Sequence, residues 1–448
     1  MKRKIGIGFV ALFLFISVVP SLGMLVGGSE ASLENRELAE LPELKTEDGW
    51  NLAFLGDMGE WYEDHFAFRN ELVTAYGLIT GKVFGTSSQD SVIVGTDNWL
   101  YYMDSLSDYQ GTDLMTERQL FDAAHTLSMI QTYAEQNGVD FIFTIAPNKA
   151  SLYGENMPYY YSGYCEDENN LSNFLPWLEA EGVNYVDLYE VFEETDEVLY
   201  HARDSHWNNR GAALAADVLL TALGQEHTSY ENADYEIRTD YSGDLEEMVY
   251  PAAVTLEDEI YYDPEPQFTY VEEVESNYSA KIYTQSTSTG SLVMYRDSFC
   301  NALLPFLAES FGDAYFSRGV PYQLATDLAS CSATTLIIER AERFIPEIAE
   351  NPPVMSGLLV TDGSADGLDY TESIQDLTLT DQGVYTKLTG TLEEGSYDVD
   401  SQIYIRINDL LVYEAFPVSL DEDTEGFVLY VPTSLLYEDG NRYEMGLS

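Results

Sequence analysis

Helix-like and strand-like segments alternate along the middle of the chain, and this alternation constrains the fold more than any other feature. A helical pattern begins at Thr116, which forms a capping box with Gln119, and it stops at Gly138. The apolar run at 139–145 follows directly and is typical of a buried strand. Strands that alternate with helices imply a parallel sheet flanked by helices on both faces, so the sequence predicts an α/β domain.

The same alternation returns further along the chain. A helix near 171–181 precedes a strand at 183–188, and a helix at 211–223 is capped by Asn208. Two further short apolar runs each lie near a helix-like segment, at 292–295 and 335–338. Because reactive groups in such folds gather at the carboxyl ends of the strands, we expect the site at that edge of the sheet. The α/β domain is expected to cover residues 29–350.

The pattern changes after Pro352-Pro353. A linker-like turn at 363–367 follows, and then Ile403, Ile405 and Ile407 alternate with polar residues. We therefore predict a small all-β, sandwich-like domain at 355–448. It is a candidate for carbohydrate binding through ring stacking, although its tyrosines fit ordinary sheet faces equally well; these are Tyr404, Tyr413 and Tyr430.

The first 28 residues predict export from the cytoplasm. A Lys-Arg-Lys cluster at 2–4 precedes an uncharged run at 5–27, which is long enough to span a bilayer. No Ala-x-Ala cleavage site is evident, so we favour an uncleaved membrane anchor over a cleaved signal peptide. Basic residues stay in the cytoplasm, which places everything after about residue 28 outside the cell membrane.

The charge of the chain excludes one class of function. It has 78 acidic and 20 basic residues and a formal net charge of −58. A field of this sign repels phosphate backbones, so nucleic acid is not an expected partner. The three cysteines are too few for a disulfide framework and lack paired zinc spacing, so cysteine does not carry the chemistry.

The sharpest local motif is Asp204-Ser-His206-Trp207, directly before the helix capped by Asn208. A carboxylate two residues before a histidine can hold one ring nitrogen while the other ring nitrogen faces a nucleophile. The alternative is an aspartate that caps a turn and a histidine satisfied within the core. The motif therefore predicts a general base only if a nucleophile is present.

Ser298 is the candidate nucleophile. The strand at 292–295 leads almost directly to this serine, and a helix-like segment with Phe299 and Leu303 follows it. Amides at the start of such a helix can stabilise a developing oxyanion. Taken alone, Ser298 could be only a helix N-cap. Together with the Asp204–His206 motif it predicts a Ser-His-Asp triad in the chain order Asp, His, Ser, without the G-x-S-x-G elbow of α/β-hydrolases.

Several short motifs resemble the SGNH-hydrolase-like proteins of alginate O-acetylation and their Gram-positive relatives, the DHHW proteins. The shared features are the N-terminal apolar segment, Glu34-Asn-Arg-Glu-Leu-Ala, Asp64-His-Phe-Ala-Phe-Arg, Asp97-Asn-Trp-Leu-Tyr-Tyr, Ala146-Pro-Asn-Lys149, Asp204-x-His-Trp and Arg296-Asp-Ser298-Phe, over roughly residues 30–350. The chain departs from Asp-His-His-Trp because Ser205 occupies the second position. The catalytic roles belong to the aspartate and the second histidine, so both remain.

The resemblance implies an SGNH-hydrolase-like fold with Ser298, His206 and Asp204 as the triad. It further implies acetyl transfer through an acyl-serine, to or from hydroxyls of an extracellular or cell-wall polysaccharide, with a membrane-bound O-acyltransferase as the acetyl donor. A polysaccharide acetyl esterase is the first alternative, because water could replace the sugar hydroxyl. A non-catalytic glycan-binding protein of the cell envelope is the second.

Two further residues are expected to contact the substrate. Lys149 follows the strand at 139–145 and could hold an anionic sugar group, although a lysine that solvates a loop has the same sequence. Trp207 is the second expected substrate-binding residue. His201, Asp204 and His206 could instead bind a metal, but no further ligand stands at a zinc-protein spacing. We therefore expect neither a metal nor an organic cofactor.

Overall fold

The structure is a computed structural model, and it describes residues 2–24, 38–46, 49–166, 168–274, 276–421, 424–438 and 440–448. Its first helix is α1 (Lys2–Gly23), and within the described residues only this helix is long and apolar enough to cross a membrane, over Gly6–Gly23. Anchors and signal sequences share that character. The expected boundary near residue 28 and the start of the Glu34 motif lie outside the described residues.

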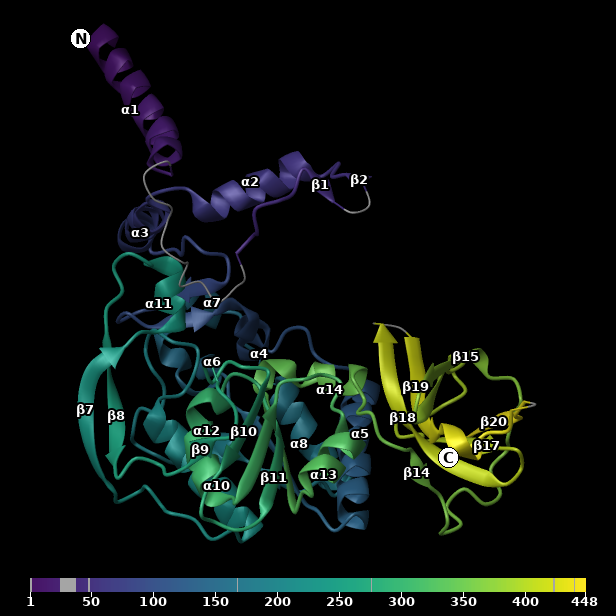
Figure 1. Ribbon diagram of the computed structural model, residues 1–448. Coiled ribbons are helices and arrows are strands. Elements are labelled where there is room, and N and C mark those ends of the chain that lie inside the picture. The colour runs from purple at the N-terminus through teal and green to yellow at the C-terminus, as the bar shows by residue number, and fades with distance from the viewer. Residues whose placement is uncertain are drawn as a thin grey trace.

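A seven-stranded sheet forms the centre of the α/β domain (Figure 1). Its strands run in the order β6 (Tyr185–Val186), β5 (Asp140–Ala146), β13 (Thr335–Ala341), β11 (Ser291–Tyr295), β12 (Asp313–Ser317), β10 (Lys281–Gln285) and β9 (Thr269–Tyr270). The first five are parallel, whereas β10 and β9 are antiparallel to their neighbours. The carboxyl ends of β5, β11 and β13, three adjacent strands, therefore meet at one edge.

Helices cover both faces of this sheet, because the strands are apolar on both sides. One face packs against α9 (Leu188–Glu193), α10 (Asn209–Leu223) and α12 (Cys300–Ser310). The other packs against α5 (Glu117–Gln136), α8 (Asn170–Ala180), α13 (Leu324–Cys331) and α14 (Pro346–Glu350). The predicted α/β class is thus confirmed, with two antiparallel strands added at one edge of the parallel sheet.

Local signals position several of these helices. Thr116 and Gln119 form the predicted capping box of α5, and Asn208 accepts hydrogen bonds from the amides of Arg210 and Gly211 at the start of α10. Gly224 ends α10 in the left-handed conformation at φ 64°. Because α10 begins two residues after Trp207, this cap fixes where the Asp204–His206 segment enters the domain.

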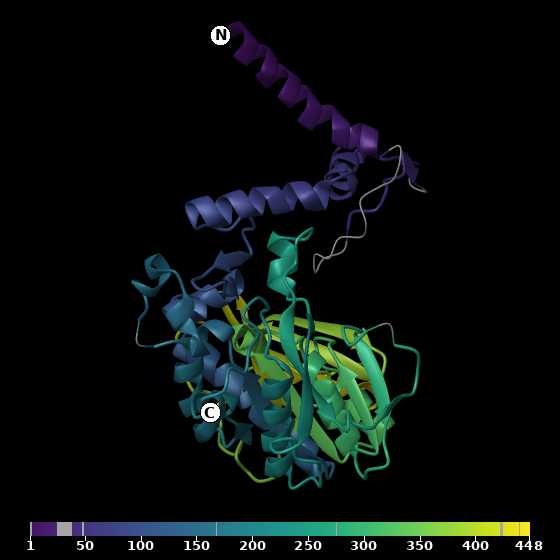
Figure 2. The ribbon, with the colours of Figure 1, turned by 90° about the vertical axis from the view of Figure 1, so that its left-hand side faces the viewer.

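Smaller elements surround the carboxyl edge of the sheet. A hairpin of β7 (Asp234–Tyr241) and β8 (Glu257–Asp263) encloses the short helix α11 (Asp244–Val249). On the N-terminal side, α2 (Phe54–His65) and α3 (Arg69–Ile79) lie between α1 and the α/β domain (Figures 1 and 2). The remaining short elements are β1 (Lys45–Thr46), β2 (Gly49–Trp50), η1 (Thr80–Phe84), β3 (Val92–Val94), β4 (Leu100–Tyr102), η2 (Met103–Ser105), α4 (Leu106–Gln110), α6 (Lys149–Leu152), η3 (Gly154–Asn156), α7 (Tyr159–Ser162) and η4 (Glu342–Phe344).

The C-terminal part is all-β, as predicted. Its strands are β14 (Leu358–Leu359), β15 (Gln375–Gln382), β16 (Tyr385–Thr391), β17 (Ile403–Ile407), β18 (Leu411–Asp421), β19 (Thr424–Pro432) and β20 (Tyr443–Leu447), with η5 (Thr433–Leu435). They form one curled antiparallel sheet, a half-barrel, rather than two separate stacked sheets. The long strand β18 makes the sheet continuous, because its first half pairs with β17 and its second half pairs with β19.

The two domains share a packed interface. Phe416 of β18 joins the hydrophobic core beside α5, and His125 of α5 contacts Glu181 at 2.8 Å and Glu414 of β18 at 3.1 Å. The tyrosines considered for sugar stacking are buried in the half-barrel, at 2–3% exposure for Tyr404, Tyr413 and Tyr430. The rings of these three tyrosines are therefore largely covered by other side chains.

Candidate active site

The three residues of the predicted triad lie within hydrogen-bond distance of one another. His206 Nδ1 is 2.7 Å from Asp204 Oδ1, and His206 Nε2 is 2.8 Å from Ser298 Oγ. A carboxylate can only accept, so Nδ1 carries the proton and Nε2 accepts from the serine hydroxyl. His206 and Ser298 are 92 positions apart in sequence. The fold brings the loop before α10 next to the loop between β11 and α12.

Ser298 is not a helix cap. The N-cap position of α12 is Phe299, and no side chain caps the helix there. The amide of Phe299 instead donates to Asp297 Oδ1 at 2.9 Å, which leaves the serine hydroxyl free to face His206. Within residues 291–300, Ser298 is the only residue that is partly exposed, and all the others are buried. Solvent can therefore reach Ser298.

The carboxylate of Asp297 links two strand ends beneath the nucleophile. In addition to the Phe299 amide, it accepts the Ala341 amide from the end of β13 at 2.6 Å. The Asp297 amide in turn donates to Glu339 Oε2 at 3.1 Å, and Glu339 is wholly buried. The pKa of Glu339 is well above its usual range because of burial and the nearby charge of Asp297. These contacts hold the turn that carries Ser298 against the central strands.

Asp204 is held by donors that come from the hairpin insertion. Its Oδ1 accepts the His206 amide at 2.8 Å, and its Oδ2 accepts Tyr241 Oη at 3.0 Å and the Asp244 amide at 2.8 Å. Asp244 also accepts the Ser205 amide at 2.8 Å and the Ser205 hydroxyl at 2.6 Å. The short loop of the base is thereby tied to the start of α11.

Charge interactions within the triad outweigh the effect of burial. Burial alone would raise the pKa of Asp204, but the adjacent charge and hydrogen bond of His206 hold that pKa below its usual range. For His206, burial would lower the pKa, and the charge of Asp204 raises it above the ordinary value. Burial and the charge of Asp204 raise the pKa of Asp244 to about 6. Asp204 thus stabilises the imidazolium that a general base must become.

The structure does not place Lys149 or Trp207 where a substrate could touch them, which corrects the prediction for both. Lys149 is 4% exposed, and its ammonium donates to the carbonyls of His201, Ala202 and Asp204. Trp207 is 1% exposed, and its indole N–H donates to the Phe299 carbonyl at 3.0 Å. Lys149 thus supports the loop that carries Asp204 and His206. Trp207 joins that loop to the start of α12, which follows Ser298.

Asp204, His206 and Asp244 have ligand atoms within 4.8 Å of one another, a spacing that could suit a metal ion. The hydrogen bonds argue for a different use, because Asp204 is already engaged by four donors and His206 by Asp204 and Ser298. His201, the third metal candidate from the sequence, contacts Glu259 at 2.9 Å and stacks on Tyr241 instead. The arrangement is that of a hydrogen-bonded triad with a supporting network.

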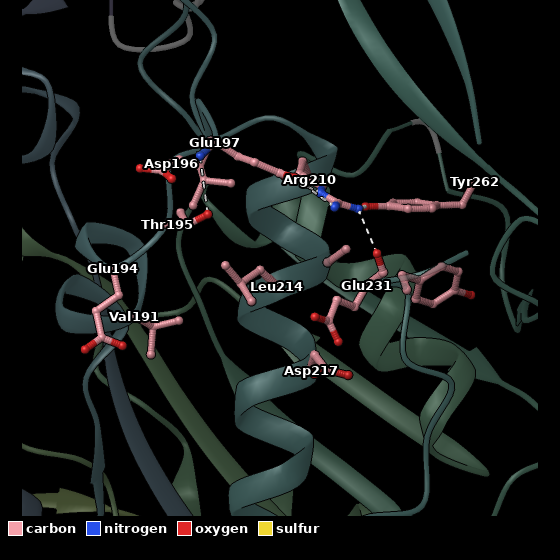
Figure 3. A pocket seen from close by; sticks show the side chains of 13 residues that line it. Val191, Glu194, Thr195, Asp196, Glu197, Arg210, Leu214, Asp217, Glu231 and Tyr262 are labelled. Atoms are coloured by element: carbon pink, nitrogen blue, oxygen red, sulfur yellow. Dashed lines mark hydrogen bonds and ion pairs between the residues drawn. The ribbon is translucent and has the colours of Figure 1, made fainter. Parts of the chain in front are cut away.

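A pocket of about 460 Å³ lies beside α10, outside the triad (Figure 3). It is lined by acidic side chains from three segments, and Figure 3 shows Arg210 extended between Glu197 and Tyr262. Arg210 Nε donates to Glu197 Oε2 at 2.6 Å, so the arginine of this pocket is already paired with protein. None of the lining residues belongs to the triad, so this pocket is separate from the candidate active site.

Sequence reasoning missed the supporting residues Tyr241, Asp244 and Asp297. Asp297 lies within the Arg-Asp-Ser-Phe motif, and an aspartate that accepts the amide two residues further on, here that of Phe299, is a local pattern that the sequence could have indicated. Tyr241 and Asp244 lie 37 and 40 residues from Asp204. No local pattern marks them, because only the hairpin topology brings them to the triad.

Part of the chain matches the model of a known family. Residues 92–287 match the family described as "SGNH hydrolase-like domain, acetyltransferase AlgX". This segment includes Asp204 and His206 and ends before Ser298. No curated protein sequence matches the chain.

Solved structures share parts of the architecture. Bacillus cereus PatB1 with a sulfonyl adduct is 16% identical with a TM-score of 0.44, over 57% of this chain and 97% of that one. A DHHW family protein from Eubacterium siraeum is 18% identical with a TM-score of 0.39, over 50% and 85%. Pseudomonas aeruginosa AlgX is 14% identical with a TM-score of 0.38, over 82% and 95%. The family match confirms the resemblance that the motifs predict: residues 92–287, less than half of the chain, are similar to this SGNH hydrolase-like domain.

Proposed function

We propose that this protein transfers acetyl groups to hydroxyls of an extracellular or cell-wall polysaccharide through an acetyl-serine at Ser298. The observation that carries the proposal is the continuous hydrogen-bonded line from Asp204 through His206 to Ser298, with distances of 2.7 and 2.8 Å. Nucleophile and base within hydrogen-bond reach, with the base oriented by a third group, are what covalent acyl transfer needs. The match to an acetyltransferase family supports the choice of acyl group.

In the first half-reaction, Ser298 Oγ attacks the acetyl carbonyl carbon of the donor while His206 Nε2 takes the serine proton. The tetrahedral intermediate collapses, the bond from carbon to the donor oxygen breaks, and the imidazolium of His206 returns the proton to that leaving oxygen. Asp204 stays ionised throughout and stabilises the imidazolium. The products are the deacetylated donor and the acetyl-serine.

In the second half-reaction, a sugar hydroxyl takes the place of the departed donor. His206 Nε2 accepts the hydroxyl proton as the sugar oxygen attacks the acetyl carbon, and Ser298 then leaves with that proton. The acetyl ester of the sugar forms, and the enzyme returns to its starting state. If water enters instead, the same steps release acetate, which is the esterase alternative.

The Ser298 amide is our candidate oxyanion donor. Within the described part of the chain, this N–H has no hydrogen-bond partner, whereas the neighbouring amides of Asp297 and Phe299 donate to Glu339 and Asp297. A free amide at the nucleophile, at the entrance to α12, is suitably located for charge that develops on the acetyl oxygen. This donor needs no metal or organic cofactor.

The donor and the acceptor are proposed to meet outside the cytoplasm. The apolar helix α1 supports membrane anchoring or export, with the catalytic domain on the outer side. We propose a membrane-bound O-acyltransferase as the acetyl donor, on the strength of the family resemblance. The resemblance likewise supports a polysaccharide as acceptor.

Acetyl release from p-nitrophenyl acetate by the purified full chain tests the triad. We expect Ser298→Ala and His206→Ala to reduce turnover by about 10⁴-fold or more, because triad members act as a unit. Ser310→Ala, a buried serine at the far end of α12, is the matched control and should retain wild-type turnover. A wild type no faster than either triad variant would support a glycan-binding protein instead.

A second measurement separates transferase from esterase. Polysaccharide fragments are added to the same reaction, and acetylated product and free acetate are quantified by mass spectrometry. Acetyl groups on the glycan that depend on Ser298 support the transferase, whereas acetate alone at every glycan concentration supports the esterase.

A further inference from the structure

Helix α3 packs its small and polar side chains against the catalytic domain. Thr74 Oγ1 accepts the Ala252 amide at 2.9 Å, and a Cβ added at Gly77 would lie 2.6 Å from the Val249 carbonyl oxygen. Val249 ends α11, the helix that also provides Asp244 to the active site. The packed face of α3 therefore has no room for large side chains.

The opposite face of α3 carries large apolar side chains in the open. We call Phe68, Leu72, Tyr76 and Ile79 the α3 stripe; their exposed fractions are 51%, 41%, 60% and 56%. Leu72, Tyr76 and Ile79 follow one another at spacings of four and three residues on one side of α3, turned away from Gly77, and Phe68 directly precedes the helix. A surface helix usually buries its apolar face. In α3 the apolar face is exposed instead, which indicates that another apolar phase covers the stripe.

One end of the stripe lies beside the apolar helix α1, because a Cβ added at Gly23 would lie 3.2 Å from Phe68 Cε2. Ser21 Oγ of α1 is 2.6 Å from Tyr62 Oη of α2, and a Cβ at Gly23 would lie 2.6 Å from Ala67 Cβ, in the turn between α2 and α3. Along its length α1 instead exposes side chains such as Phe9 at 70%. In Figures 1 and 2, α1 leaves the molecule from the side where α2 and α3 lie across its base.

We propose that the α3 stripe lies in the outer interface of the lipid bilayer that α1 enters, so that α2 and α3 form a platform for the catalytic domain. The apolar rings and chains would insert below the headgroups, with the Tyr76 hydroxyl at headgroup level. The inference is independent of the proposed acetyl transfer.

The charge of the chain decides which lipids suit this surface. At a formal net charge of −58, attraction to anionic headgroups cannot drive binding. Within α3, the charged residues are Arg69, which is buried, and Glu71. Contact with the bilayer is therefore apolar, is satisfied by zwitterionic lipid and depends little on salt.

Photolabelling of the full chain in phosphatidylcholine vesicles tests the proposal. The vesicles contain a small fraction of a diazirine phosphatidylcholine, and labelled peptides are identified by mass spectrometry. We expect label on the peptides that contain Leu72 and Ile79, in 0.1 M and in 0.5 M salt alike. Leu72→Glu/Ile79→Glu should reduce that label by about tenfold, because carboxylates oppose insertion into lipid, while α1 stays labelled.

Val384→Glu/Leu410→Glu is the matched control, since these apolar side chains are more exposed than Leu72 and Ile79, at 75% and 72%, and lie on the C-terminal domain. It should leave the label on α3 unchanged. Wild-type α3 without label, or label unaffected by the glutamates, would overturn the proposal. Label that appears in native membranes but not in protein-free vesicles would assign the stripe to a membrane protein and would also overturn it.

Discussion

The two sides of the candidate triad are built in different ways. On the nucleophile side, Ser298 follows β11 within the central sheet, and Asp297 ties its turn to the amide of Ala341 at the end of the neighbouring strand β13. On the base side, Asp204 and His206 lie in a loop held by Tyr241 and Asp244 from the hairpin insertion. One side is supported mainly from within the sheet, the other by polar groups from distant segments.

This difference separates two tasks. The nucleophile must keep a fixed position at a helix start, which backbone bonds to a buried sheet provide. A general base gains a positive charge during each turnover, so it needs carboxylates and hydroxyls that are already placed to stabilise that charge. We therefore expect damage on the nucleophile side to appear in stability as well as activity, and damage on the base side to appear mainly in rate and pH dependence.

The largest effect is expected from Asp204→Asn. The amide keeps the size of the side chain but removes the charge that orients and stabilises His206, so turnover should fall by about 10⁴-fold while the fold persists. Initial rates with p-nitrophenyl acetate measure this. Asp217→Asn is the matched control, because Asp217 also contacts a histidine, His227 at 3.0 Å, and neither residue belongs to the triad. Turnover within tenfold of wild type would remove Asp204 from the triad.

The same variant predicts a shift in pH dependence. In the wild type, Asp204 raises the pKa of His206, so the imidazole stays protonated and inactive as a base to a pH above about 6.5. Activity should therefore rise as pH increases through that raised pKa. In Asp204→Asn the burial of His206 remains and its closest counter-charge is lost, although Asp244 stays 3.6 Å from Nδ1, so the pKa of His206 should fall and the midpoint of kcat/KM should move to lower pH. A midpoint that moves upward would contradict this origin of the shift.

A large effect on stability is expected from Asp297→Ala on the nucleophile side. The variant leaves the buried amides of Phe299 and Ala341 without acceptors. At about 1–3 kcal/mol for each unsatisfied group, the free energy of unfolding should fall by about 2–6 kcal/mol. Guanidinium denaturation measures the loss.

Asp381→Ala provides the control, because Asp381 also accepts a backbone amide, that of Gly383 at 2.8 Å, but in an exposed turn. Its loss should stay below about 1 kcal/mol, since water replaces the bond. If Asp297→Ala and Asp381→Ala lose the same free energy of unfolding, the hydrogen bonds of Asp297 stabilise the fold no more than one in an exposed turn.

The smallest effect is expected from Tyr241→Phe on the base side. The change removes one donor to Asp204 Oδ2 and keeps the ring that stacks on His201. A single hydrogen bond of about 0.5–1.5 kcal/mol corresponds to a kcat lower by about two- to thirteenfold, with little change in the free energy of unfolding. Tyr261→Phe, which removes a comparable bond to Asp240 on the same hairpin, should not change kcat. Equal kcat values for the two variants would place Tyr241 outside the catalytic network.

Much of the α/β core could be predicted from the sequence because its signals are local. Thr116 with Gln119, Asn208, and the apolar strand before Ser298 each act within a few residues, and the structure has the corresponding elements. Strand edges were harder to predict. The strand predicted at 183–188 is present as the short edge strand β6, whereas the antiparallel strands β9 and β10 were not predicted; β9 is a two-residue edge strand with few neighbours to pack against.

The candidate site likewise has features that the sequence could predict and features that it could not. Lys149 and Trp207 were predicted to bind substrate from their places in motifs, yet both are buried and support the catalytic loops. A motif shows that a residue type is needed near a site, but it does not show which way the side chain points. That direction follows from the packing of segments far apart in sequence.

The sequence by itself determined the class of the catalytic domain and the residues of a candidate triad, because hydrophobic period, helix caps and the Asp204-x-His206 spacing all act over short distances. Only the tertiary structure decided that His206 meets Ser298 across 92 residues, that Tyr241 and Asp244 hold Asp204, and that α3 turns its apolar face outward. These depend on how the hairpin and the sheet close around one another, and such long-range packing leaves no periodic pattern along the chain.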